Sequence, residues 1–139
     1  MSLHPDFPVV SGAYALTKDW TLTLPVQFNR RIEDGSMVLW MPELTFWINI
    51  WNNDARVPPE DQLVRLLNDA DPARSDEQIE RGDALLRLSY ELADDEPDGR
   101  AISAHVISQT GYVQLSVHYD SPEARSMAYA IIHSLKGHQ

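Results

Sequence analysis

The feature that most constrains the fold is the stretch from Met37 to Asn53, which holds three of the four tryptophans. It is typical of two strands joined by a tight turn at Pro42-Glu43. Side chains in a strand alternate between the two faces of a sheet, so this stretch contributes to two different surfaces. The core face carries Phe46, Ile48 and Ile50, and the opposite face carries Thr45, Trp47, Asn49 and Trp51.

The second face mixes large aromatic rings with amides, and two interpretations of it stay open. Trp47 and Trp51 are covered if the later stripe Leu63-Leu66-Leu67 forms a helix that packs on them. If no helix covers them, they form an exposed aromatic patch, which is typical of an interaction surface.

The length of the chain indicates one domain. A chain of 139 residues with 43% hydrophobic content buries a core without a metal or a disulfide, and it contains no cysteine for thiol chemistry. We expect residues 1–11, which include two prolines, to be a flexible lead-in, and residues 12–139 to form a single domain. The N-terminus has no basic start followed by an apolar run, so we expect no secretory signal and a cytoplasmic protein.

The net charge of −10 limits the partners of this protein. Between Asp54 and Arg100 there are 14 acidic and 6 basic residues, a net charge of −8 in 47 positions. This charge repels nucleic-acid phosphates and anionic lipids, and no apolar run approaches the ~18 residues of a membrane span. We therefore expect no nucleic acid and no membrane as partner. The acidic region favours a basic protein partner, but it is also typical of an ordinary solvated surface.

The order of the expected elements indicates the fold class. Strands are expected at 13–17, 20–24, 27–33, 36–41 and 44–51, with a hairpin at Asp34-Gly35. A helix at 60–70 and a short helical turn at 75–81 follow, the latter because Ser75 and Gln78 match a capping box. Strands then return at 85–92, 101–109 and 112–120, before a closing helix that starts at Pro122. This order predicts an α+β protein with an antiparallel sheet and helices packed on it.

The hydrophobic alternation also predicts which polar residues share the face of Trp47 and Trp51. A two-residue turn at Thr110-Gly111 would set His105 opposite Ser116 and His118 opposite Ser103, with the two histidines about 7 Å apart. The resulting binding-surface candidates are Trp47, Asn49, Trp51, Arg87, Glu91, His105 and His118.

No catalytic or cofactor signature accompanies these candidates. A metal or acid–base site formed by His105, His118 and Glu91 lacks any local ligand spacing. There is no nucleophile elbow and no phosphate-binding glycine loop. We therefore predict no catalytic residue, no metal and no cofactor.

Several segments resemble bacterial proteins of the Mog/PsbP-like superfamily, which includes DcrB-like proteins. The resemblance covers residues 12–137 and is one of layout. It rests on the opening segment 20–25, the long strand ending in Trp51, the central helix, and the closing strand that runs through Asp120-Ser-Pro-Glu into a helix ending Ile-Ile-His-Ser-Leu. The resemblance implies an α/β/α sandwich whose members mostly bind other proteins and rarely catalyse reactions. No functional residue is carried over from it.

These observations lead to two functional hypotheses. The first is a non-enzymatic protein-binding accessory, chaperone or inhibitor module. The alternative is a small-ligand-binding domain with a pocket between Trp47, Trp51, Arg87 and His105. Self-association as a homodimer also stays open, because an aromatic strand at a sheet edge can pair with its own copy.

Overall fold

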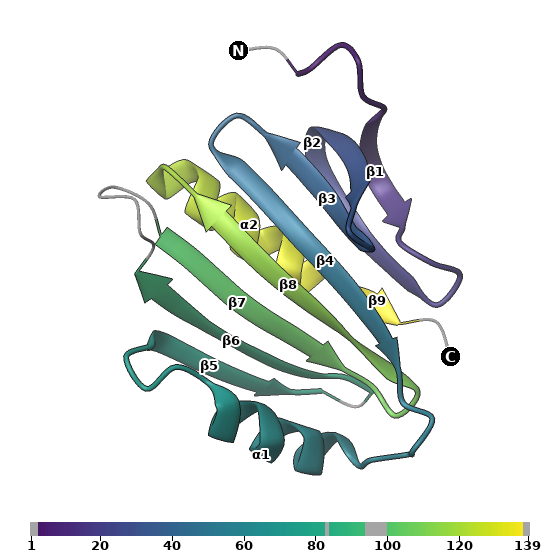
Figure 1. Ribbon diagram of the computed structural model, residues 1–139, viewed down its shortest axis with the longest axis vertical. Helices are drawn as coiled ribbons and strands as arrows, with labels where there is room; N and C mark the ends of the chain where they lie inside the picture. The colour runs from purple at the N-terminus through teal and green to yellow at the C-terminus, as the bar shows by residue number, and fades with distance from the viewer. Residues whose placement is uncertain (1–2, 83, 94–99, 138–139) are drawn as a thin grey trace.

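The protein is built on one large antiparallel sheet (Figure 1). The computed structural model describes residues 3–82, 84–93 and 100–137. Within these residues the strand order is β1-β2-β3-β4-β8-β7-β6-β5, and β9 pairs with β2. The elements are β1 (Val9–Ala15), β2 (Trp20–Glu33), β3 (Ser36–Met41), β4 (Leu44–Asn52), α1 (Pro59–Asp69), β5 (Ser75–Arg81), β6 (Leu86–Ala93), β7 (Arg100–Ile107), β8 (Gly111–Tyr119), α2 (Pro122–Ser134) and β9 (Lys136–Gly137).

The two helices of the described chain cover only part of the sheet, so the predicted α+β class with an α/β/α sandwich is wrong. Helix α2 packs on one face, across β2, β4 and β8, while α1 lies beside β5 and β6 at one edge (Figure 1). Helix α1 packs against β6, next to the edge strand β5, and so does not cover the middle of the sheet. The fold is mostly β, and the antiparallel sheet is the part of the prediction that is confirmed. Neither helix in the described chain is long and apolar enough to cross a bilayer.

The sheet has a separate hydrophobic cluster on each face. The larger one lies under α2 and includes Phe28, Phe46 and Leu115, all fully buried. The smaller one lies under α1 and includes Leu63 and Leu88. Side chains alternate between the two faces along β6. Its leucines therefore point to α1, and the polar residues between them point to the α2 side. The sequence prediction had assigned the apolar residues of all the strands to one face of the sheet and a single core.

Two hairpins form as predicted, and the turn between β7 and β8 does not. Asp34 and Gly35 both have positive φ, 50° and 85°, as a two-residue turn of this kind requires. Glu43, after Pro42, has φ 73°. At the third hairpin, Ile107 pairs with Tyr112, so the central residues are 109–110 rather than Thr110-Gly111. The Ser108 hydroxyl stabilises this turn by accepting from the Gly111 N–H at 3.1 Å.

Gly111 is required by strand packing rather than by the turn. A Cβ at this position would lie 2.5 Å from the backbone oxygen of Trp51 in β4. We expect Gly111→Ala to push β4 and β8 apart and to lower the free energy of unfolding by about 1–3 kcal/mol, measured by urea denaturation. Gly137→Ala is the control, because its Cβ would meet nothing closer than 3.5 Å. Equal stability of the two variants would contradict this explanation.

Three further segments differ from the sequence prediction. Residues 75–81 form strand β5 instead of a helical turn, because Ile79 pairs with Leu88 and packs against the cluster under α1. Strand β2 runs unbroken through Pro25, next to the irregularity in its pairing with β1 near Gly12. Strand β1 begins at Val9, inside the expected lead-in.

The segment before β1 is fastened to the sheet by Asn29, which is fully buried. The Asn29 side-chain oxygen Oδ1 accepts from the His4 backbone N–H at 2.7 Å, and the side-chain nitrogen Nδ2 donates to the His4 backbone carbonyl oxygen at 3.0 Å. This pair of bonds sets the described part of the N-terminal segment against β2.

Candidate functional site

Neither of the two helices in the described residues covers the face of β4 and β8 that points away from α2 (Figure 1). Its side chains come from paired positions on the two strands, because Trp47 lies opposite Ser116 and Trp51 opposite Tyr112. We call this surface the tryptophan face and define it by Thr45, Trp47, Asn49, Trp51, Tyr112, Gln114, Ser116 and His118.

The two tryptophans of this face are exposed. Trp47 is 37% and Trp51 41% accessible, so of the two interpretations left open by the sequence, the one in which a helix covers them is wrong. The apolar stripe of α1 packs instead on β6, against Leu86 and Leu88. The Trp51 ring stacks on Tyr112 with 5.0 Å between ring centroids and an interplanar angle of 24°. Exposed aromatic rings ordered by such a stack form a rigid apolar surface.

Trp40 in β3 marks one border of the tryptophan face. The Phe7 ring meets it edge-on with 5.0 Å between centroids, and the Arg31 guanidinium lies 4.5 Å from its centroid. Arg31 is also paired with Glu33 at 2.8 Å. This border is therefore already occupied by the N-terminal segment and by an ion pair.

The tryptophan face carries little charge. Its one ionisable side chain besides Tyr112 is His118, whose Nε2 lies 2.9 Å from an oxygen of Asp120. Asn49 accepts from the Ser36 hydroxyl at 2.7 Å. Aromatic rings surrounded by uncharged polar groups are typical of the centre of a protein–protein interface, where charged residues are depleted.

His105 lies on the same side of the sheet but is buried, with 6% exposure. Its Nε2 is 3.5 Å from the Ser103 hydroxyl, and its Nδ1 has no hydrogen-bond partner within the described residues. Burial lowers the pKa of His105 to about 4, so the ring is neutral near pH 7. It pairs with Gln114, four residues before His118 on β8, which puts the two histidines roughly 13 Å apart along the strand instead of diagonal to each other.

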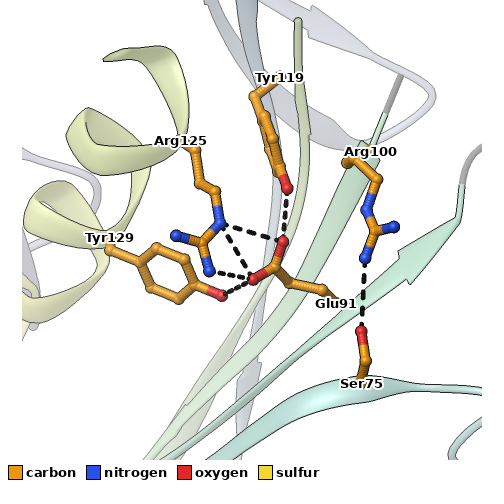
Figure 2. Close-up of polar contacts among 6 residues, drawn as sticks. All are labelled: Ser75, Glu91, Arg100, Tyr119, Arg125 and Tyr129. Atoms are coloured by element: carbon orange, nitrogen blue, oxygen red, sulfur yellow. Dashed lines mark hydrogen bonds and ion pairs between the residues drawn. The ribbon is translucent and has the colours of Figure 1, made fainter. Parts of the chain in front are cut away.

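Glu91 lies on the opposite face, in a buried polar cluster under α2 (Figure 2). Its carboxylate accepts from the Tyr119 hydroxyl, from the Tyr129 hydroxyl at 2.9 Å, and from Arg125 Nε at 3.1 Å and Nη2 at 2.5 Å. Burial alone would raise the pKa of Glu91, but the hydrogen bonds from Arg125 and the two tyrosines outweigh burial and lower it to about 2. The cluster ties α2 to β6 and β8, and Glu91 is not available to a partner.

Arg87 also lies on the α2 side, and it does not stack on the tryptophans. Its Nη2 donates to the Leu135 carbonyl oxygen at 2.8 Å, just after the end of α2. A cation in this position satisfies and stabilises the carbonyl end of the helix. Arg87 and Glu91 are therefore separated by the sheet from Trp47 and Trp51, and neither the predicted pocket nor the metal or acid–base site is formed.

The structure adds the aromatic ring of Tyr112 to the binding-surface candidates and excludes three of the seven predicted residues from the tryptophan face. Trp47, Asn49, Trp51 and His118 come together on the tryptophan face, whereas Arg87, Glu91 and His105 do not belong to it. Tyr112 was missed, although its spacing from Gln114 was a sufficient signal. Two hollows of about 330 and 660 Å³ lie where α1 begins, around Pro58 and Pro59, and none of the seven candidates lines either of them.

No protein-family model and no curated protein matches this chain. The resemblance to the Mog/PsbP-like superfamily stays a prediction, and the sandwich fold that it implies is not the fold observed.

Proposed function

We propose that this protein is a non-enzymatic protein-binding module and that its partner docks on the tryptophan face. The observation that carries the proposal is the exposure of Trp47 and Trp51 on a part of the sheet that neither α1 nor α2 covers. Tryptophan and tyrosine dominate the binding energy of protein interfaces, and Tyr112 holds the Trp51 ring in place.

The charge of the protein indicates the chemistry of the partner. The net charge is −10, yet the tryptophan face itself carries almost no charge. A partner that presents apolar side chains to the rings and basic groups around them fits both properties, because opposite charges speed association and the apolar contact supplies affinity. The docked partner would act as the client or target of an accessory, chaperone or inhibitor protein.

The test compares capture of a partner by the wild-type protein and by the double variant Trp47→Ser, Trp51→Ser. We expect a near-stoichiometric protein to co-purify with the tagged wild type at natural expression level. The double variant should bind it at least about 30-fold more weakly, since loss of one hot spot costs about 2 kcal/mol.

Val64→Ser is the matched control. Val64 is an apolar residue of α1 with 56% exposure that lies outside the tryptophan face, so this variant should bind normally. Thermal unfolding should show that all three proteins are folded. Equal capture by the double variant would place the partner elsewhere, and the absence of any partner of the wild type would refute the module itself.

A further inference from the structure

The two outer strands of the sheet differ in chemistry. Strands β1 and β5 lie at opposite edges (Figure 1). The sequence of β5, Ser-Asp-Glu-Gln-Ile-Glu-Arg, has four charged residues in seven, and its pairing with β6 is irregular near Asp76, which has φ 53°. Charges and bulges of this kind prevent an edge from pairing with another chain. The sequence of β1, Val-Val-Ser-Gly-Ala-Tyr-Ala, has no charged residue.

The backbone of β1 presents hydrogen-bonding groups at this edge. The Leu16 N–H donates to the Trp20 carbonyl oxygen at 2.8 Å. Because antiparallel pairing alternates, the N–H and C=O groups of Ala13 and Ala15 then point away from β2. Thr23, which pairs with Ala13, agrees with this alternation, since its N–H donates to the Ser134 hydroxyl on the side remote from β1.

The irregular pairing near Gly12 limits the usable part of the edge to residues 12–15, which pair in regular register with 21–24. Ala13 and Ala15 are exposed and small. On the face of these two alanines another strand can therefore approach β1 without meeting a bulky side chain, while Tyr14 between them points to the other face and packs against the cluster under α2.

A second copy of the chain can supply that strand, because a twofold axis brings the outward N–H and C=O groups of Ala13 opposite those of Ala15 in the copy, and the distribution of charge does not oppose this pairing. The described residues between 54 and 100, which include α1, β5 and β6, comprise nine acidic and six basic residues, and β1 itself carries no charge. Seven strand spacings of about 4.8 Å put β5 about 34 Å from β1, well beyond the Debye length of roughly 8–10 Å in physiological salt. Two copies joined at β1 keep their acidic parts at the far ends.

We propose that two copies of this protein pair antiparallel through residues 12–15 of β1, around a twofold axis, and form one continuous sheet. The axis is perpendicular to the sheet, so the tryptophan faces of both copies lie on the same side. The dimer itself does not depend on the proposed function. If both hold, the dimer presents two docking surfaces to a bivalent partner.

The test introduces charges of either sign into β1 and measures the molecular mass of the full chain by light scattering and sedimentation. The wild type should have twice the 15.8 kDa mass of the chain. The variants Ala13→Lys, Ala15→Lys and Ala13→Glu, Ala15→Glu should each dimerise at least tenfold more weakly, because like charges meet across the axis. A mixture of the two double variants should recover the dimer, because opposite charges then face each other.

Gln78→Lys on β5 is the control and should leave the dimer intact. Circular dichroism checks that each variant is folded. If the charged variants unfold, Ala15→Pro replaces them, because it removes an N–H that points away from β2 and breaks no bond to β2. A wild-type monomer at about 1 mM would overturn the proposal. So would a dimer that resists every β1 variant, or one that dissociates with Trp47→Ser, Trp51→Ser, because it would use another surface.

Discussion

Glu91→Gln is expected to lower the free energy of unfolding by about 3 kcal/mol, and the melting temperature by about 10 °C. Glu91 is 1% exposed, and its carboxylate accepts hydrogen bonds from Arg125 Nε and from the hydroxyls of Tyr119 and Tyr129. An amide replaces one acceptor oxygen by an NH2 donor, so the Arg125 Nε–H keeps only one of its two acceptors, and the tyrosine hydroxyl on the amide side must turn from donating to accepting. It also removes the charge that compensates Arg125.

The matched control for this variant is Glu33→Gln. Glu33 also forms an ion pair with an arginine, Arg31 at 2.8 Å, but its side chain is 51% exposed. An exposed pair of this kind contributes less than about 1 kcal/mol. Urea denaturation of both variants at pH 7 measures the difference. If Glu91→Gln were no more destabilising than Glu33→Gln, the buried cluster would not be what holds α2 on the sheet.

The second large effect is a loss of stability on mild acidification, caused by His105. In the folded protein burial lowers the pKa of His105 from 6.5 to about 4, so the unfolded chain takes up the proton first. The stability contributed by neutral His105 is complete above pH 6.5 and is lost as the pH falls towards 4. At about 1.4 kcal/mol for each pKa unit, the loss reaches about 3 kcal/mol.

Urea denaturation between pH 7 and pH 4.5 tests this effect. His105→Gln should remove most of the slope in this range, whatever its stability at pH 7. His118→Gln is the control and should retain the slope of His105, because it removes a histidine from β8 and leaves the buried His105 in place. A wild-type slope in His105→Gln would show that another group causes it. Glu91 also has a lowered pKa, about 2, but its contribution is lost only below about pH 4.5, so the two effects occupy different pH ranges.

Features that depend on a few neighbouring residues were predictable from the sequence. Asp34-Gly35 specifies its turn because both positions must adopt positive φ. The alternation in β4 places Trp47, Asn49 and Trp51 on one face because the strand geometry has a period of two. The same local chemistry misled at 75–81, where the capping-box pattern is real but the pairing of Ile79 with β6 outweighs it.

The choice of face for each strand depends on packing between distant segments. Strand β6 has an apolar and a polar side, and either helix offers an apolar stripe to cover it, so alternation alone does not say that its leucines face α1 while Glu91 and Arg87 face α2. The pairing of Ile107 with Tyr112 depends on the Ser108 hydroxyl and on the close approach of Gly111 to β4. The exposure of Trp47 and Trp51 follows from where α1 packs, because the apolar surface of β5 and β6 occupies its only apolar stripe and leaves none for the tryptophan face.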